Sequence, residues 1–289
     1  MTALHYREVA PPTDLQWAIE CFWFADGPAE GTERIVPDGC PELVIQLCGS
    51  MRAGDEGQPL SGQPRAVLVG QRSRALLVSP ASAFRTVAVR LRPAAFGRVL
   101  HDDAHRLTDG WASLEEPFGQ DGRTLVARIE DGRTDPERCA ALVTFLRRRL
   151  ARARPDRPVD GAVEAIRRAR GRITVRALRE TTGASERALE RAFLREVGLP
   201  PRNLAAVLRV QAALLLRDAE PSWASLAAEL AYVDQPHLTR EFHRVAGLPP
   251  CALLDALGPL ARAFVDPGRL RELLGVGSVQ DRGAGLRTG

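Results

Sequence analysis

The sequence contains no lysine, only five cysteines and no long apolar run. Its strongly basic side chains are all arginine, which suits bidentate contacts to phosphate or guanine, although a GC-rich genome produces the same bias. The cysteines are scattered without C-x-x-C spacing, which argues against a disulfide framework or a cysteine metal site. No stretch approaches the ~18 apolar residues of a membrane span, and the first residues lack the features of a secretory signal. We therefore expect a cytoplasmic globular protein without a membrane partner.

The motifs of common enzymes are also missing. No H-E-x-x-H, G-x-S-x-G or phosphate-binding glycine loop occurs. His101 and His105 flank Asp102 and Asp103, a set that could ligate a metal, but such a sequence is more often a solvated loop or helix end. We predict no catalytic residue, no metal site and no cofactor, and an enzymatic first half is the weakest of the functions considered.

The first half of the chain has the pattern of short β-strands. Runs rich in Val and Leu are broken by Gly, Pro or Ser, which is typical of strands and turns. These runs cover 43–49, 66–70, 75–79 and 84–92. The polar segment 50–65 is expected to be a loop.

A change of composition at 153–161 predicts a domain boundary. Two prolines, several charges and a glycine fall within this stretch, which cannot continue a helix. We place a linker there, between a sensor or dimerisation domain at 1–152 and a helical domain at 162–257. The tail, 258–289, is rich in Gly and Arg and is expected to be partly disordered. The predicted fold class is α+β, with a β-rich first domain that carries some helices and an all-α second domain.

A pattern of about twenty residues occurs twice in the helical half. TGASERALERAFLREVGLPP (182–201) and AYVDQPHLTREFHRVAGLPP (231–250) share Leu, Arg, Phe and Gly-Leu-Pro-Pro at an offset of 49 residues. Each copy predicts a helix-turn-helix. Gly183 suits a left-handed residue after the first helix, and Ser185 suits the cap of the next. Gly247 ends the last helix of the second copy.

The second helix of each copy exposes side chains that suit DNA recognition. In the second copy Leu238, Phe242 and Val245 form the buried stripe, which leaves polar residues outside. Gln can pair with adenine and Arg with guanine in the major groove. The plainer alternative is that two helical hairpins merely expose polar residues. The predicted DNA-binding residues are Arg187, Glu190, Arg191, Arg195, Arg209, Gln235, His237, Thr239 and Arg240.

Residues 162–257 resemble the AraC/XylS-type DNA-binding domain, in which two helix-turn-helix units are joined by a long helix, here 201–218. The resemblance is carried in the second unit by Leu238, Arg240, Phe242, Gly247 and Pro250. It implies a tandem helix-turn-helix transcription factor that reads two successive major-groove segments of double-stranded DNA. Two departures stand out: Ala231-Tyr232 lies where the family usually has Gly-Phe, and Pro236 replaces a polar residue that often points toward bases.

Charge divides unevenly between the two units. Residues 155–217 hold 13 Arg against 7 acidic residues, a net charge of +6, whereas 218–258 hold 2 Arg against 6, a net charge of −4. Phosphate neutralisation supplies much of the affinity of DNA-binding proteins. We therefore expect the first unit to anchor binding and the second to contribute mainly discrimination.

The first half resembles the uncharacterised, cupin-like N-terminal domain found on many such regulators, through segments 20–47, 69–70 and 87–100. This resemblance implies a sensor domain that binds a small effector, and it names no ligand. The candidate effector-binding residues are Trp23, Asp38, Cys40 and Arg90. A redox sensor acting through Cys40, or a pure oligomerisation module, is the alternative to a diffusible effector.

Each candidate also has a plainer structural interpretation. The aromatic trio 22–24 is expected mostly in the core, Asp38 is expected to serve the geometry of a tight turn, and Arg90 and Arg92 are expected to be solvated.

The segment 139–153 carries an apolar stripe that could pack on its own domain or on a second subunit. The stripe consists of Leu142, Phe145, Leu146 and Leu150. We predict a homodimer, with RNA polymerase as a further partner. The operator, the effector and the choice between activation and repression stay open at this stage.

Overall fold

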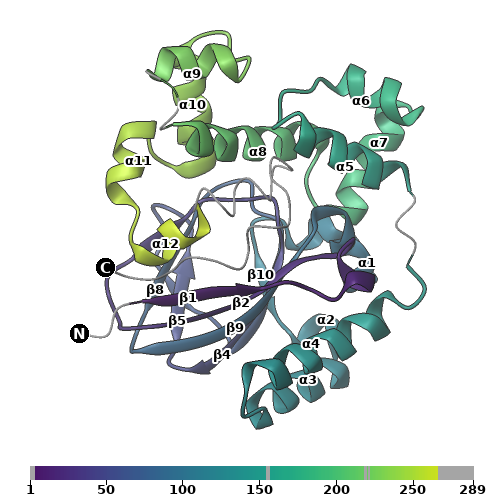
Figure 1. The fold of residues 1–289 in the computed structure, drawn as a ribbon, viewed down its shortest axis with the longest axis vertical. Coiled ribbons are helices and arrows are strands. Elements are labelled where there is room, and N and C mark those ends of the chain that lie inside the picture. The colour runs from purple at the N-terminus through teal and green to yellow at the C-terminus, as the bar shows by residue number, and fades with distance from the viewer. Residues whose placement is uncertain (1–3, 154–156, 218–219, 221, 266–289) are drawn as a thin grey trace.

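The computed structural model describes residues 4–153, 157–217, 220 and 222–265. The first half folds into two antiparallel sheets (Figure 1). In order across the first sheet, the strands are β1 (His5–Val9), β2 (Ile19–Gly27), β9 (Phe84–Leu91), β4 (Glu42–Cys48), β7 (Ala66–Val69) and β10 (Trp111–Ser113). The second sheet consists of β3 (Glu33–Ile35), β8 (Leu76–Pro80), β5 (Met51–Gly54) and β6 (Ser61–Gly62). The predicted β-rich first domain is confirmed.

The helices of the first domain lie mainly after the strands. They are the 3₁₀ turns η1 (Thr13–Leu15), η2 (Pro93–Ala95) and η3 (Ala104–Leu107) and the helices α1 (Phe96–Leu100), α2 (Glu115–Phe118), α3 (Gln120–Asp131) and α4 (Asp135–Leu150). The second half is helical, as predicted. It contains α5 (Pro158–Arg168), α6 (Val175–Thr182), α7 (Glu186–Glu196), α8 (Pro201–Leu216), α9 (Trp223–Glu229), α10 (Gln235–Ala246), α11 (Pro250–Ala256) and α12 (Pro259–Phe264).

The segment 50–65, which we expected to be a loop, contains paired strands instead. Met51 and Ala53 are buried while Arg52 is exposed, an alternation typical of a strand with one covered face. The backbone of β5 pairs with β6 and β8. The polar composition of the connecting turn is the reason that the sequence pattern did not indicate this short hairpin.

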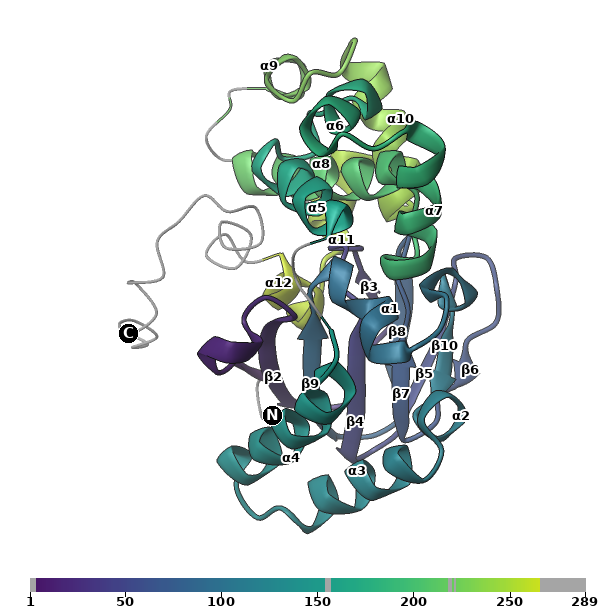
Figure 2. The same cartoon turned by 90° about the vertical axis from the view of Figure 1, so that its right-hand side faces the viewer.

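The apolar stripe of α4 packs inside its own domain. Leu142, Phe145, Leu146 and Leu150 are buried in one cluster with the large sheet and α3, and Figure 2 shows both helices against the strands. The first of the two alternatives for this helix is therefore correct, and the stripe is not available to a second subunit.

Two predicted boundaries differ from the structure. Helix α5 begins at Pro158, inside the predicted linker, because proline is well tolerated in the first turn of a helix. Helix α12 lies inside the predicted tail and packs on the first domain. Residues 266–289 of the predicted tail lie outside the described part of the chain.

Local backbone signals set the ends of both helix-turn-helix units. Gly183 and Gly247 adopt φ values of +68° and +76°, which only glycine does without strain. The side chains of Ser185 and Asp234 accept hydrogen bonds from backbone N–H groups in the first turns of α7 and α10. Both recognition helices therefore begin and end where the sequence indicates.

Ala231 is the residue that departs from the usual glycine of the AraC/XylS pattern, and its φ is +56°. The left-handed region costs a residue with a Cβ about 1–2 kcal/mol, which exceeds the entropy that glycine loses on folding. We expect Ala231→Gly to raise the free energy of unfolding by about 0.5–1 kcal/mol, measured by denaturant titration. The matched Ala228→Gly, on exposed α9, should lower it by about 1 kcal/mol. A loss of stability in both variants would contradict the assignment of strain to Ala231.

Candidate DNA-binding surface and sensor cavity

Most of the predicted DNA-binding residues lie on the outer surfaces of α7 and α10, the second helix of each helix-turn-helix. The exposed members are Arg187, Glu190, Arg191, Arg195, Gln235 and Arg240, and the half-buried members are His237 and Thr239. Figure 2 shows α7 and α10 on the same side of the helical domain. In helix-turn-helix proteins the N-terminal part of this helix meets the base edges.

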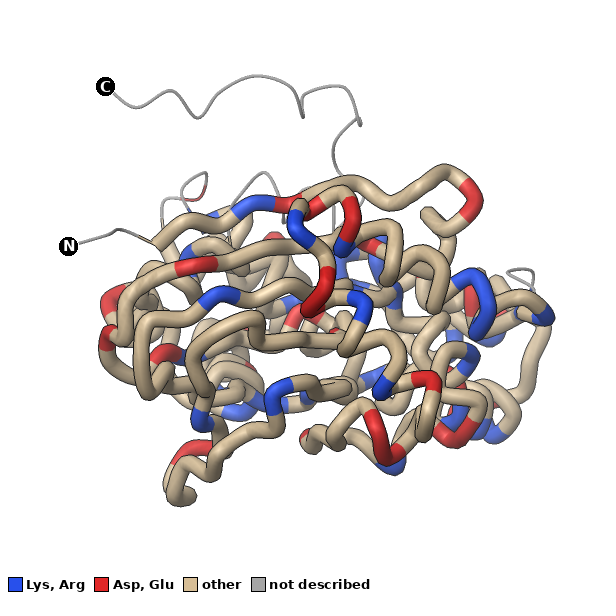
Figure 3. Tube along the Cα trace, turned by 90° about the horizontal axis from the view of Figure 1, so that it is seen from below, with Lys and Arg blue, Asp and Glu red and all other residues tan. Residues whose placement is uncertain are grey.

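Several arginines of the helical domain are already paired with carboxylates. In the view of Figure 3 the basic and acidic residues alternate along the trace instead of forming a face of one sign. Within the helical domain, Arg168 pairs with Glu164 and Arg176 with Glu180. Among the described residues, no carboxylate forms an ion pair with the arginines at the centre of the predicted surface, which are Arg187, Arg191 and Arg240.

Arg209 has a different environment from the other predicted DNA-binding residues. Its Nε donates to Glu241 Oε1 at 3.0 Å, and its guanidinium lies 4.5 Å from the centre of the Tyr232 ring. The Tyr232 hydroxyl donates to the same carboxylate at 2.7 Å. Burial, followed by the negative charge of Glu241, raises the pKa of Tyr232 well above its ordinary value, so the hydroxyl stays a donor. Arg209 thus links α8 to α10. Tyr232, which lies where the AraC/XylS-type domain usually has Phe, is part of this link.

The C-terminal end of α7 is fixed to the sensor domain by a buried ion-pair cluster. Arg98 on α1 donates to Glu196 at 2.8 and 3.0 Å and to Asp160 at 2.7 Å. Gly97 lies so close to the Arg195 carbonyl that a Cβ would collide with it. Arg195 itself donates to Glu196 at 3.0 Å, so it belongs to this anchored end. No local sequence pattern could have indicated this contact, because its partners are 98 residues apart.

The last turn of α10 is capped by the sensor domain as well. Arg34 on β3 donates from Nη1 to the Ala246 carbonyl at 3.1 Å, and it is held by Glu56 at 2.7 Å. A free carbonyl at a helix C-terminus is a favourable partner for a cation. Both recognition helices are therefore held at their C-terminal ends and exposed toward their N-terminal ends.

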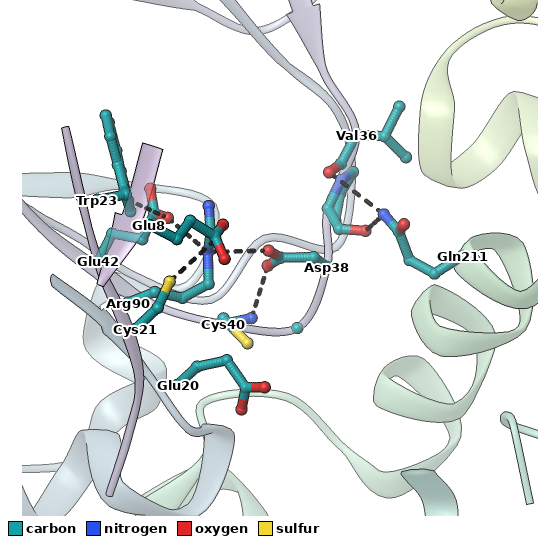
Figure 4. Close-up of polar contacts among 12 residues, drawn as sticks. Glu8, Glu20, Cys21, Trp23, Val36, Asp38, Cys40, Glu42, Arg90 and Gln211 are labelled. Carbon is teal, nitrogen blue, oxygen red and sulfur yellow. Dashed lines mark hydrogen bonds and ion pairs between the residues drawn. The ribbon is translucent and has the colours of Figure 1, made fainter. Parts of the chain in front are cut away.

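The connecting helix α8 rests on the turn Val36–Cys40 of the sensor domain (Figure 4). Gln211 is fully buried and donates from Nε2 to the Pro37 carbonyl at 2.6 Å. Gly39 has φ +79°, and a Cβ there would lie 2.8 Å from Leu204 Cδ1 on α8. The turn is thus shaped to touch α8 directly, and glycine is required for both its conformation and its close approach.

The same turn lines a cavity of about 100 Å³ between the two sheets. Trp23, Asp38 and Cys40, three of the four predicted effector residues, are among its lining residues. The remaining wall is mostly apolar and includes Ala25, Ile35, Val44, Met51, Val67, Val69, Leu76, Val78 and Phe84, together with Leu260 and Phe264 from α12. Its other polar members are Glu42, Gln46, Gln63, Arg72 and Thr86. Such a lining, with a few polar groups, is typical of small-molecule sites.

Arg90 is not solvated, contrary to our expectation. Its side chain is 0% exposed and lies against Glu8 at 2.9 Å, Glu42 at 2.8 Å and Asp38 at 3.3 Å. Burial by itself would lower the pKa of Arg90, but the negative charges around it, Glu42 and Asp38 among them, hold that pKa above its ordinary value. A buried arginine is compatible with a stable fold only when nearby carboxylates pair with its charge, as they do here. The alternation of residues along the strand could not show whether the side chain of Arg90 is buried or exposed.

The neighbours of Arg90 explain the other predicted effector residues. Asp38 accepts from the Cys40 backbone N–H at 2.9 Å, which is the turn role expected for it, and it also pairs with Arg90. Trp23 donates from Nε1 to Glu42 at 3.0 Å and is buried, as expected for the aromatic trio. Arg92 is half-buried and pairs with Glu20 at 3.3 Å, so it is not simply solvated either.

The group around His101 shows no metal-like arrangement. His101 lies 2.7 Å from the Arg149 carbonyl, and Asp102 pairs with Arg106 at 2.6 Å on the surface. Across the described residues, no three His, Cys, Asp or Glu side chains gather in a way that could hold a metal ion.

Comparison with known proteins agrees with this geometry. Residues 178–256 match the family described as a helix-turn-helix domain. The chain is a DNA-binding transcriptional regulator with an AraC-type helix-turn-helix domain. Residues 7–113 of the regulator match a domain of unknown function (DUF6597). No curated protein matches the regulator in sequence.

Several solved structures of ToxT from Vibrio cholerae are similar to the regulator. ToxT from strain O395 is 10% identical, with a TM-score of 0.46 over 82% of this chain and 98% of that chain. Wild-type ToxT from strain SCE256 with a bound unsaturated fatty acid is 12% identical, with a TM-score of 0.44 over 81% and 94%. ToxT bound to (E)-4-(8-methylnaphthalen-1-yl)but-3-enoic acid is 10% identical, with a TM-score of 0.45 over 89% and 100%.

In the part of the chain that the structure describes, every helix is too short or too polar to cross a bilayer.

The anchor at Glu196 predicts a pH-dependent stability. Burial raises the pKa of Glu196, but hydrogen bonds from Arg195, Arg98 and Arg157 outweigh it, so the pKa lies below its ordinary value of 4.5. The stabilisation by the ionised carboxylate is therefore complete above pH 4.5 and is lost as the pH falls through the lowered value. We expect Glu196→Gln to lower the free energy of unfolding by about 3 kcal/mol at neutral pH, and less as the solution is acidified.

Denaturant titrations over a pH series would measure this difference. The matched Glu180→Gln removes one partner of an exposed pair with Arg176 and should change stability little at any pH. A difference between wild type and Glu196→Gln that stays constant on acidification would contradict the role assigned to Glu196.

Proposed function

We propose that the regulator reads two successive major-groove segments with α7 and α10 and that a small effector in the sensor cavity controls this binding. The observation that carries the DNA contact is the contrast among the arginines. Arg187, Arg191 and Arg240 are exposed without a carboxylate partner among the described residues, whereas Arg168, Arg176 and Arg209 are paired. Exposed, unpaired guanidinium groups are the ones free to meet phosphate or guanine.

The proposed base contacts come from Gln235, His237, Thr239 and Arg240 on α10 and from Arg187 and Glu190 on α7, whereas Arg191 on α7 contacts phosphate. Arg195 and Arg209 act by positioning, because both are engaged with carboxylates of the protein. Pro236 leaves the start of α10 with one fewer polar contact. In this proposal the first unit supplies most of the affinity, since α7 presents two exposed arginines without an ion pair among the described residues, Arg187 and Arg191, whereas α10 presents Arg240 and its Arg244 pairs with Glu241.

Control by an effector is supported by the position of the cavity. Asp38 and Gly39 belong to its wall and to the turn on which α8 rests. A ligand that moves this wall must also change the support of the helix that joins the two helix-turn-helix units. This shared wall favours a diffusible effector over a pure oligomerisation module or a redox sensor at Cys40. The regulator so proposed acts in the cytoplasm as a homodimer, contacts RNA polymerase, and carries out no enzymatic reaction.

Two arginine substitutions test the DNA surface and its division of labour. After a binding site is selected from random duplexes, we expect Arg191→Ala to weaken binding by about 2–3 kcal/mol and Arg240→Ala by about 1–2 kcal/mol. Titration at several salt concentrations should also show a smaller salt slope for Arg191→Ala, because it neutralises phosphate. Arg123→Ala, on exposed α3 of the sensor domain, is the control and should bind like wild type.

Either of two results would count against this proposal. A larger loss from Arg240→Ala than from Arg191→Ala would overturn the division of labour. Wild-type affinity in both variants would remove α7 and α10 from the DNA interface.

A further inference from the structure

Helix α12 closes one side of the sensor cavity with two apolar side chains, although it follows the DNA-binding helices in the chain. The ring of Phe264 lies 5.5 Å from the Trp23 ring and 5.8 Å from the Tyr6 ring, centre to centre. Leu260 and Phe264 are both buried and both line the cavity. Figure 1 shows α12 beside β1 and β8, below α11. Part of the cavity wall therefore comes from the far end of the chain.

The attachment of α12 to the sensor domain is small. The Glu33 carboxylate accepts hydrogen bonds from the backbone N–H groups of Leu260 at 3.1 Å and Ala261 at 2.7 Å. These contacts cap the first turn of a six-residue helix. The strands on the other sides of the cavity are held by antiparallel ladders of several residue pairs each, such as β2 with β9 and β4 with β9. Movement of α12 therefore breaks two hydrogen bonds and the contacts of its buried side chains, but no β-ladder.

The size of the cavity favours such a movement for a ring-shaped ligand. Its volume is about 100 Å³, whereas an apolar cavity that holds benzene measures about 150 Å³. Removal of the Phe264 ring would enlarge the space beside Trp23 by one aromatic ring. The Phe264 ring already fits beside Trp23, so a ligand with a ring of similar size can take its place.

The polar group beneath Phe264 restricts the chemistry further. The guanidinium carbon of Arg90 lies 4.7 Å from the centre of the Phe264 ring. Among the described residues, Nη2 of Arg90 has no hydrogen-bond partner, so a donor is available when the ring leaves. Three carboxylates, from Glu8, Asp38 and Glu42, already surround this one cation. A further negative charge is therefore disfavoured, whereas a neutral acceptor is suitable.

We propose that Phe264 occupies the place of the effector ring: the sensor cavity binds a small, neutral aromatic compound with a hydrogen-bond acceptor, in competition with α12. The ring of the compound replaces that of Phe264 against Trp23, and its acceptor meets Nη2 of Arg90. The proposal rests on the proposed effector control and names the ligand class and the resident competitor. Since α12 follows α11 and α10 directly, ligand entry releases a sensor contact of the second helix-turn-helix unit.

Calorimetric titration of the full chain with benzamide tests this competition, because benzamide is a neutral ring with a carbonyl acceptor. Phe264→Ala removes the competitor, so we expect it to bind benzamide at least about tenfold more tightly than wild type. Phe264→Leu keeps part of the apolar contact and should show an intermediate gain, which preserves the test if the alanine variant is unstable. Arg262→Ala changes an exposed residue of the same helix and should bind like wild type. Benzoate, with the same ring and a negative charge, should bind each protein at least about tenfold more weakly than benzamide does.

Hydrogen exchange on wild type provides the second readout. Saturating benzamide should speed the exchange of the Leu260 and Ala261 amides, which Glu33 protects in the free protein. Equal benzamide affinity in wild type and both Phe264 variants would overturn the proposal, as would tighter binding of benzoate or unchanged exchange in the ligand complex. Duplex binding by the same samples distinguishes failure of this proposal from failure of the proposed function. If DNA is bound normally but the benzamide results are not obtained, only the proposed ring site is wrong.

Discussion

The turn from Val36 to Cys40 has to fit two surfaces at once. On one side it lines the cavity between the sheets, and on the other its carbonyls and Gly39 lie against α8. Asp38 fixes the turn from below, because it accepts the Cys40 backbone N–H and pairs with buried Arg90. The conformation of this short segment therefore depends on the charge cluster inside the sensor domain. The position of the helix that joins the two DNA-reading units depends on it in turn.

Arginine holds this arrangement together in a chain that has no lysine. Arg90 organises the inner cluster, Arg98 fixes α7, Arg34 caps α10 and Arg209 joins α8 to α10. Each of these guanidinium groups meets two or more partners, which a planar fork does better than a single ammonium group. The bias toward arginine thus supports the fold as much as the DNA surface. The net charge of a segment is for this reason a weak guide to where DNA binds, since an arginine paired with a carboxylate contributes little to the electrostatic potential at the protein surface.

The sequence predicted the parts of the molecule that depend on local patterns. The four Val- and Leu-rich strands, the repeated helix-turn-helix and the caps at Ser185 and Gly247 follow from neighbouring residues, and all are present. Three features depend on contacts between distant segments and could not be predicted in this way: the burial of Arg90, the pairing of Arg209 with Glu241, and the docking of α12. A polar residue in a pattern does not reveal whether its partner is water or a carboxylate many residues away.

The most direct test of this account is whether sensor contacts set the relative placement of α7 and α10. Gln211→Leu removes the hydrogen bond to Pro37 and leaves a buried carbonyl unsatisfied, which costs about 1–3 kcal/mol of docking. Because two fixed helices pay less ordering entropy than two loose ones when both enter DNA, the account predicts that the variant binds a duplex with both groove segments about tenfold more weakly. On a duplex with only the first segment, its affinity should equal that of wild type. Equal affinities of variant and wild type on both duplexes would contradict the account.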